Sequence, residues 1–495
     1  MNISLLVLIV YIAITVGISL YFATKNNSLK QFSVADSGLG VPLIVALLFS
    51  ELIAGAGTIG NAAEAFESGV SSVWANWGMA IGCVLFLLLA AKFYRAMCKT
   101  HGVVSIPEAY RLLFDSRCRT VLLVIVVVVY GIIYSSQPMA AASMLAPLLK
   151  IDTVIVSWIM AGIFVLITLF GGLKGIAWMN FVHAAVMYIG MIIVAVKSLS
   201  TVGGIDALQA SLPSHFFDFG QPNWPTVIAY ALGTGISFLA SSTIVSATYA
   251  AKSTRTCNKG IIISAVLIIP FALAPAVIGM CAKVYDPSIS ANSALFQMSD
   301  KLGVGFSALT STAVMAAIAS TAPALLIAVS TALGRDFYKG IIRQKATDRE
   351  QLLFTKAMAI VVGFGANFFG LHTSSILNQM LGAFQIRSVV GIVLIAAIFW
   401  PRVTASAAFW SMLFGGTVAA VWHFGGNPGG IAPLWPAAAV CLIVLVSVTL
   451  RSKEKVSPGH LLYRQALQDM KTAESHIGVN GEAASIMPED GPTEL

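Results

Sequence analysis

The sequence predicts an all-α polytopic membrane protein, and two observations carry this prediction. Of the 495 residues, 58% are hydrophobic and only 10% are charged, whereas a soluble globular protein has about 25% charged residues. The apolar residues form long unbroken runs, such as the one that begins at Val121, and not the alternating segments of about ten residues that a membrane β-barrel shows. Because lipid offers no partners for backbone amides and carbonyls, these runs are expected to be helices.

Hydropathy places about 13 transmembrane helices along the chain, at about 20 residues each. The expected spans are 4–23, 42–63, 72–91, 120–146, 153–172, 179–200, 226–250, 260–282, 305–333, 356–371, 378–400, 405–423 and 434–450. We therefore expect residues 1–450 to form a single transmembrane domain, and residues 451–495 to form a cytoplasmic tail that is partly disordered. Short helices outside the membrane are expected near Pro107 and from Pro458 to about Ser475.

The basic residues predict the orientation of the chain. An odd number of spans puts the two termini on opposite sides, and 24 of the 29 Lys and Arg residues then fall on one side, with four on the other and Arg387 in or near a span. The positive-inside rule makes the side with 24 the cytoplasm. The N-terminus is thus expected outside and the C-terminus inside the cell (inner) membrane. The net charge of +8 is explained by topology, so no nucleic-acid partner is expected.

Two glycine clusters occupy matching places in the sequence. Gly55 and Gly57 lie in the second span, and Gly233 and Gly235 lie in the seventh, about 180 residues and five spans later. Because the two clusters are an odd number of spans apart, the spans that carry them cross the membrane in opposite directions. The two halves, at about 42–200 and 226–400, would therefore be inverted repeats, of the kind that place broken helices around a site at the middle of the membrane. Each glycine weakens a helix by roughly 1 kcal/mol. The four glycines are candidate substrate-site residues, although close helix packing is the alternative explanation.

The ninth span carries a pattern that suits a small cation. Ala317, Ser320 and Thr321 stand at positions i, i+3 and i+4 and therefore share one helical face. Two hydroxyls and a carbonyl there supply neutral oxygens, which are the ligands that a hard cation prefers. Further carbonyls are expected from the glycine-loosened second span. The alternative is that both hydroxyls only bond back to carbonyls of their own helix.

The run 317–339 resembles closely the A-x-x-S-T…S…D-[IF]-Y-K signature of the sodium/solute symporter family, the group of the sodium/proline and sodium/galactose symporters. Segments 21–40, 50–69 and 170–178 resemble other parts of that family, and the resemblance covers about residues 4–450. It implies the five-plus-five inverted repeat of the leucine transporter, with one leading and two trailing helices. It also implies a Na⁺ site whose ligands are the carbonyls of Ser50, Ile53 and Ala317 and the hydroxyls of Ser320 and Thr321.

One departure from the family pattern lies in the sixth span. Where the family usually has Thr-Asp-x-x-Gln, this chain has Met179, Asn180 and His183. The acidic residue thought to help Na⁺ leave is thus absent, and the role of Asn180 stays open. A proton-coupled symporter of the same fold, using Glu51 or His183, is the alternative.

Ionisable residues inside spans are costly and are therefore candidates for function. Glu51 in the second span could hold a substrate amine, balance Na⁺, carry a proton or pair with a neighbouring helix. Arg387 early in the eleventh span could bind a carboxylate, gate the outer vestibule or extend to the membrane interface. Tyr134 and Gln137 in the fourth span are candidate hydrogen-bond partners of a solute, or ordinary contacts between helices.

Together these features predict a secondary active transporter. The expected function is Na⁺-coupled symport of a small polar organic solute, amino acid-like or a carboxylate, into the cell by alternating access. The expected partners are the solute, the coupling ion Na⁺ and the lipid bilayer, and the protein is expected to be a monomer or a weak oligomer. Proton coupling and a transporter-like membrane sensor subunit are the alternatives. No nucleophile–base constellation or nucleotide-binding loop suggests an enzyme.

Overall fold

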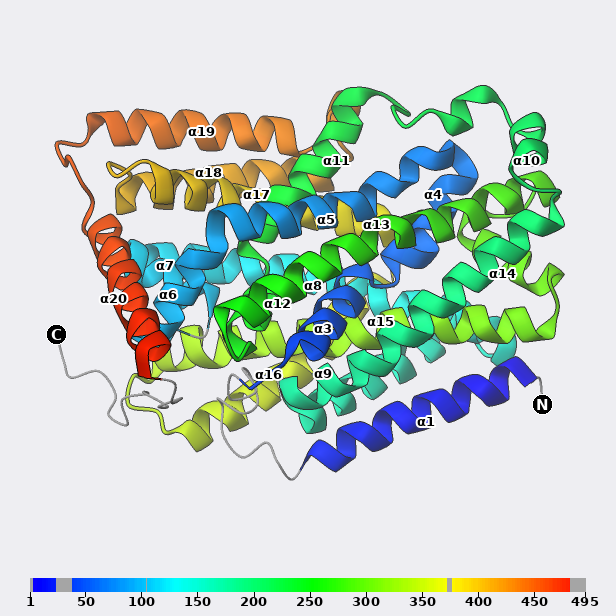
Figure 1. Cartoon of the computed structure of the whole chain (residues 1–495), viewed down its shortest axis with the longest axis horizontal. Coiled ribbons are helices and arrows are strands. Elements are labelled where there is room, and N and C mark those ends of the chain that lie inside the picture. Colours follow the sequence, from blue (N-terminus) through cyan, green and yellow to red (C-terminus); the bar gives the residue numbers. More distant parts are fainter. Residues whose placement is uncertain (1–2, 24–37, 104, 372–375, 481–495) are drawn as a thin grey trace.

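The apolar runs of the sequence form long helices that lie roughly side by side (Figure 1). The computed structural model describes residues 3–23, 38–103, 105–371 and 376–480. Ten helices among them are long and apolar enough to cross a membrane, and the bent pair Trp224–Ala240 and Ser242–Ala250 makes an eleventh. Two shorter apolar helices, Leu5–Tyr21 and Val41–Ser50, cover the two remaining predicted spans.

The helix bounds follow the predicted spans with small shifts. The spanning elements are α1 (Ile3–Ala23), α3 (Val41–Ile53), η2 (Ala56–Gly60), α4 (Asn61–Ser68), α5 (Trp74–Leu85), η4 (Phe86–Ala90), α6 (Ala91–His101), α8 (Ser116–Leu149), α9 (Thr153–Thr201), α11 (Trp224–Ser237), η6 (Phe238–Ala240), α12 (Ser242–Ala250), α13 (Thr254–Tyr285), α15 (Val304–Ala332), η8 (Leu333–Ile342), α16 (Asp348–Gly370), α17 (Ile376–Phe399), α18 (Ala405–Phe424) and α19 (Leu434–Arg451). The connecting elements are η3 (Gly69–Val73), α7 (Ile106–Leu113), α10 (Ile205–Ser211), η5 (Ser214–Phe217), η7 (Ala291–Ser293), α14 (Ala294–Lys301), η9 (Pro428–Gly430) and α20 (Pro458–Asn480).

Two of these elements are longer than the sequence predicts. The fifth and sixth predicted spans fall within one helical element, α9, whose two parts, Thr153–Gly171 and Gly175–Thr201, are each long and apolar enough to cross a membrane. The helix expected from Pro458 to about Ser475 is α20, and it continues to Asn480. Residues 481–495, which were expected to be disordered, lie outside the described residues.

The second span is broken at the first glycine cluster. Helix α3 ends at Ile53, Ala54 adopts a φ of 54°, and helical structure resumes at η2. A positive φ is costly for alanine and persists where the surroundings hold it. The Oε1 atom of Gln137 accepts a hydrogen bond of 3.3 Å from the amide of Gly55 and so fixes the break.

The seventh span is also broken, but after its glycines and not at them. Helix α11 ends at Ser237, and α12 begins at Ser242 with a bend of 42° between the two halves. Gly233 and Gly235 lie inside regular helix, where added Cβ atoms would come within 3.0 Å of Gln385 and 3.2 Å of Ile81. The expectation that these glycines mark the unwound stretch is wrong, because they allow α17 and α5 to pack closely.

The two ends of the bundle differ. Helix α1 begins at the right in Figure 1, whereas α20 lies across the left end of the bundle, which we call the α20 end. There His460 Nδ1 lies 3.1 Å from the carbonyl of Ala397, and the ring of Tyr463 packs on Phe93. The C-terminal helix therefore covers the ends of α6 and α17.

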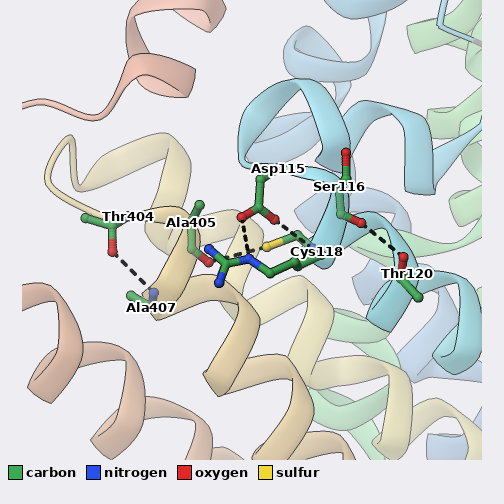
Figure 2. Close-up of polar contacts among 8 residues, drawn as sticks. Asp115, Ser116, Cys118, Thr120, Thr404, Ala405 and Ala407 are labelled. Atoms are coloured by element: carbon green, nitrogen blue, oxygen red, sulfur yellow. Dashed lines mark hydrogen bonds and ion pairs between the residues drawn. The ribbon is translucent and has the colours of Figure 1, made fainter.

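The starts of α8 and α18, at the α20 end, are connected by a hydrogen bond (Figure 2). Asp115 caps α8 by accepting a hydrogen bond of 2.9 Å from the amide of Cys118, and Thr404 caps α18 in the same manner. The Cys118 thiol donates to the carbonyl of Ala405 at 3.4 Å. These bonds fix the start of α8, the helix that carries Tyr130 into the centre of the bundle.

Candidate functional site

Neutral oxygens from α3 and α15 converge near the break in the second span. The hydroxyl of Ser320 donates to the carbonyls of Ala317 and Ser50, both at 2.8 Å. The hydroxyl of Thr321 donates to Ala317 at 3.0 Å and to Ser50 at 3.5 Å. All four residues are buried. The structure thus brings four of the five predicted Na⁺ ligands to one point, and Ile53 lies one turn beyond Ser50 as the last residue of α3.

This arrangement goes beyond ordinary back-bonding within a helix. The bonds from Ser320 and Thr321 to Ala317 are local, as the alternative explanation requires. The bonds to Ser50 join two helices that are 270 residues apart in the chain, so they require the packing of α3 on α15. Hydroxyl and carbonyl lone pairs directed at one buried point are the ligand set that a small hard cation uses.

Uncharged polar groups surround the oxygen cluster on its α9 side. The hydroxyl of Ser50 donates to the carbonyl of Asn180 at 2.9 Å. The side-chain amide of Asn180 is buried, and neither of its polar atoms has a hydrogen-bond partner among the described residues. His183, one turn later, is hydrogen-bonded through Nδ1 to the hydroxyl of Tyr11 on α1. This side of the site therefore lacks the carboxylate that the family pattern has at position 180.

A buried arginine lies close to the break in the seventh span. Arg387 on α17 is 1% exposed. Its Nε donates to the carbonyl and hydroxyl of Ser237 at 3.1 and 2.7 Å, and its Nη1 donates to the hydroxyl of Tyr130 at 2.8 Å. The rings of Tyr130 and Phe384 lie 5.3 and 5.2 Å from the guanidinium carbon. The expectation that Arg387 could extend to the outer interface is wrong, because these neighbours enclose it.

A small central cavity lies between the arginine and the oxygen cluster. It lies between the break after α3 and the helices α8, α12, α15 and α17. Its lining residues are Leu52, Ala54, Tyr130, Ile133, Phe238, Ser241, Thr243, Thr321, Leu325, Met380, Phe384 and Arg387. Thr321 belongs to both features, so a solute in the cavity would lie beside the oxygen cluster.

A second cavity lies between α7, α8, α12 and α15 on the α20 side of the central cavity, and Thr243 lines both cavities. On the other side of the bundle, η2 packs tightly on α17, since a Cβ added to Gly60 would lie 3.0 Å from Leu377.

Other predicted site residues lie away from the central cavity. Gln137 donates both amide hydrogens, to the carbonyl of Ile133 and the hydroxyl of Ser136, and holds Gly55 through its oxygen. Tyr134 is buried near Gly363 of α16 and does not line the cavity. Gly57 packs on Asn76, which donates to its carbonyl at 3.0 Å. The side chain of Glu51 lies outside what the structure describes.

The fold and these two features define the class of protein. Two broken spans, five spans apart, both line the central cavity, and the first of them also contributes to the buried oxygen cluster; this is the construction of secondary transporters with inverted repeats. The chain belongs to the sodium:solute symporter family, whose sequence profile matches residues 32–415. It is therefore a multi-pass membrane protein of a transporter family and not of an enzyme family, as the sequence predicts.

Relatives of known name are similar over nearly the whole chain. The osmoregulated proline transporter OpuE of Bacillus subtilis (strain 168) is 22% identical over 480 residues, which cover 92% of this chain and 96% of that protein. The high-affinity proline transporter PutP of the same organism is 24% identical, covering 87% and 94%. The sodium/glucose cotransporter of Vibrio parahaemolyticus is 22% identical, covering 82% of each chain. Family membership thus supports Na⁺-coupled transport, while the relatives differ in their solutes.

Solved structures confirm the predicted fold class. A Na⁺-coupled sialic acid symporter, in a substrate-bound outward-open state, matches with a TM-score of 0.76 at 16% identity, covering 91% of this chain and 97% of the other. MhsT in complex with L-phenylalanine matches with a TM-score of 0.55 at 15% identity, covering 82% and 98%. The architecture is the five-plus-five inverted repeat shared with the leucine transporter, preceded by α1 and followed by α18 and α19.

Proposed function

We propose that this protein imports a small polar organic solute, amino acid-like or a carboxylate, by Na⁺-coupled symport across the cell (inner) membrane. The observation that carries the proposal is the convergence of the Ser50 and Ala317 carbonyls with the Ser320 and Thr321 hydroxyls, next to a cavity that Thr321 also lines. The Ile53 carbonyl completes the proposed ligand set. The repeats are assigned to about 42–200 and 226–400, within a transmembrane domain of residues 1–450.

Coupling would arise because Na⁺ bridges two parts of the protein that enclose the solute. An ion between Ser50 and Ser320 favours conformations in which α3 lies against α15, and it fixes the direction of the Thr321 hydroxyl at the cavity wall. A ligand shifts a conformational equilibrium only by its difference in affinity for the two states. Na⁺ and solute would therefore each raise the affinity for the other, because both need the same packing of α3 on α15.

Alternating access would use the two sides of the central cavity. A cavity lies beside α12 on the α20 side, while η2 and α17 are in contact on the other side. With the α20 end in the cytoplasm, as the basic residues predict, this arrangement corresponds to access from inside. The reverse arrangement requires α17 to separate from η2 and the space along α12 to close.

The test is transport by the purified protein in proteoliposomes. Uptake of labelled proline, propionate and pyruvate is measured with an inward Na⁺ gradient at equal pH on both sides, and then with an inward proton gradient in Na⁺-free choline buffer. We expect accumulation of at least one solute with the Na⁺ gradient alone. Accumulation that needs the proton gradient and ignores Na⁺ would replace the proposal with the proton-coupled alternative.

A further inference from the structure

The charge of Arg387 is not balanced by any described part of the protein. Its side chain is 1% exposed, and no described acidic side chain lies within 4.0 Å of it. The acceptors that surround it are neutral: the carbonyl and hydroxyl of Ser237 and the hydroxyl of Tyr130. Because a buried charge is stable only when it is paired and hydrogen-bonded, this environment favours an anion as the missing partner.

The guanidinium also retains donors for such an anion. An arginine has five N–H bonds, and the contacts to Ser237 and Tyr130 use the Nε hydrogen and one hydrogen of Nη1. The hydrogens that remain are the second one on Nη1 and those on Nη2, at the end of the side chain. Arg387 lines the central cavity, so these hydrogens are available to a solute there. Parallel N–H bonds from the two Nη atoms are the geometry with which arginine holds a carboxylate.

A second donor lies beside the guanidinium. The hydroxyl oxygen of Tyr130 accepts hydrogen bonds from Arg387 at 2.8 Å and from the amide of Ser242 at 2.5 Å. A hydroxyl oxygen has two lone pairs, so its own hydrogen must point elsewhere, and Tyr130 also lines the cavity. Ser242 is the first residue of α12, and a helix start favours negative charge. This edge of the cavity therefore offers hydrogen-bond donors and positive charge.

Much of the remaining lining of the cavity is apolar. It includes Leu52, Ile133, Phe238, Leu325 and Met380, and none of the lining residues that the structure describes is Asp or Glu. A sugar would leave several hydroxyls facing these side chains without partners, which is costly in a buried site. An ammonium group would find no carboxylate among the lining residues that the structure describes.

We propose that the transported solute is a small monocarboxylate, whose carboxylate is bound by Arg387 and Tyr130 and whose short apolar part packs against the apolar lining residues of the cavity. The inference rests on the proposed function and names the class of solute for the same cavity. It also assigns the two residues that determine specificity. Tyr134, one turn further along α8, is buried and off the cavity, so Tyr134→Phe is a matched control for Tyr130→Phe.

The experiment measures binding and transport on the same purified proteins. Melting temperatures are recorded in NaCl and in KCl of equal strength, with propionate, pyruvate, proline or glucose added, for wild type, Arg387→Gln, Arg387→Lys, Tyr130→Phe and Tyr134→Phe. We expect propionate or pyruvate to stabilise wild type in NaCl, and Arg387→Gln to weaken that binding by about 30-fold or more. Tyr130→Phe should weaken it about tenfold, and Tyr134→Phe should not change it. Arg387→Lys should bind weakly, because lysine lacks the two-pronged geometry.

Stabilisation by NaCl alone separates this inference from the proposed function. If Na⁺ stabilises wild type and Arg387→Gln equally, the variant is folded and its ion site is intact, so the solute result can be interpreted directly. Proline binding in place of both monocarboxylates would overturn the solute class, as would monocarboxylate binding that is unchanged in Arg387→Gln. If NaCl has no effect on wild type, the proposed Na⁺ coupling itself fails, whichever solute binds.

Discussion

The hydroxyl of Ser320 on α15 donates a hydrogen bond of 2.8 Å to the carbonyl of Ser50 on α3. The acceptor lies one turn before the break in the second span, so the bond joins the broken helix to an unbroken one. Both residues are buried, and both oxygens are neutral. A cation at this junction would bind to oxygens that the fold already places together, which is why the ion is expected to control how α3 packs on α15.

The first prediction concerns the ion. Ser320→Ala and Thr321→Ala each remove a hydroxyl from the cluster and should abolish or strongly reduce the increase in melting temperature that NaCl produces over KCl. Ser330→Ala is the matched control, because Ser330 is buried in the same helix and its hydroxyl bonds only to carbonyls of that helix. A full Na⁺ effect in Ser320→Ala, or its loss in Ser330→Ala, would contradict the site.

The second prediction concerns Asn180. Asn180→Asp places a carboxylate on the residue whose backbone carbonyl accepts the hydrogen bond from Ser50, so the protein should lose stability in KCl and regain it in NaCl, where Na⁺ balances the new charge. The difference in melting temperature between the two salts should therefore exceed that of wild type. Asn180→Leu, which adds no charge, serves as the control. An equal salt difference in wild type and Asn180→Asp would show that position 180 does not interact with the ion.

The third prediction concerns the packing of α17 against the seventh span. A Cβ added to Gly391 would lie 2.2 Å from the carbonyl of Ile236, so Gly391→Ala must displace the backbone just before the break. Overpacking of this kind costs about 1–3 kcal/mol or more. Gly131→Ala in α8 meets no atom within 4 Å and should change the melting temperature little. Equal stability of the two variants would show that α11 and α17 do not pack as described.

The fourth prediction concerns the cap of α8, outside the spans. Partial burial alone would raise the pKa of Asp115, but hydrogen bonds from Cys118 and the Arg117 guanidinium outweigh it and hold that pKa below its usual value. Asp115 therefore contributes stability above the ordinary aspartate pKa, and the contribution is lost as the pH falls through the lowered value. Asp115→Ala should cost about 1 kcal/mol near neutral pH. The difference from wild type should shrink in acid, and a constant difference would refute the assignment.

Much of the fold can be predicted from the sequence, because each span must be apolar along its length and must form the hydrogen bonds of its backbone amides and carbonyls within the same helix. The oxygen cluster is equally local: Ala317, Ser320 and Thr321 share a helical face through spacing alone. The break at Ala54 could also be predicted, since glycines there loosen the helix. In each case the information lies within a single segment of at most about 20 residues.

The surroundings of Arg387 could not be predicted in this way. Its partners Ser237 and Tyr130 lie 150 and 257 residues away in the chain, and no periodicity relates them. The prediction that Gly233 and Gly235 mark the unwound stretch of the seventh span was wrong for a related reason, because a glycine can allow close helix packing as well as unwinding. Gln137 was identified as a polar residue at mid-membrane depth, but only the packing of α8 on the broken span shows that it holds Gly55.

The most direct test of the account is uptake driven by a Na⁺ gradient in proteoliposomes that contain wild type or Thr321→Ala, at equal pH on both sides. The account predicts that wild type accumulates propionate or pyruvate above the external concentration, and that Thr321→Ala does not. It also predicts that replacing Na⁺ with choline abolishes accumulation by wild type. Accumulation that persists in choline, or that stays fully Na⁺-dependent in both Ser320→Ala and Thr321→Ala, would contradict coupling through this site.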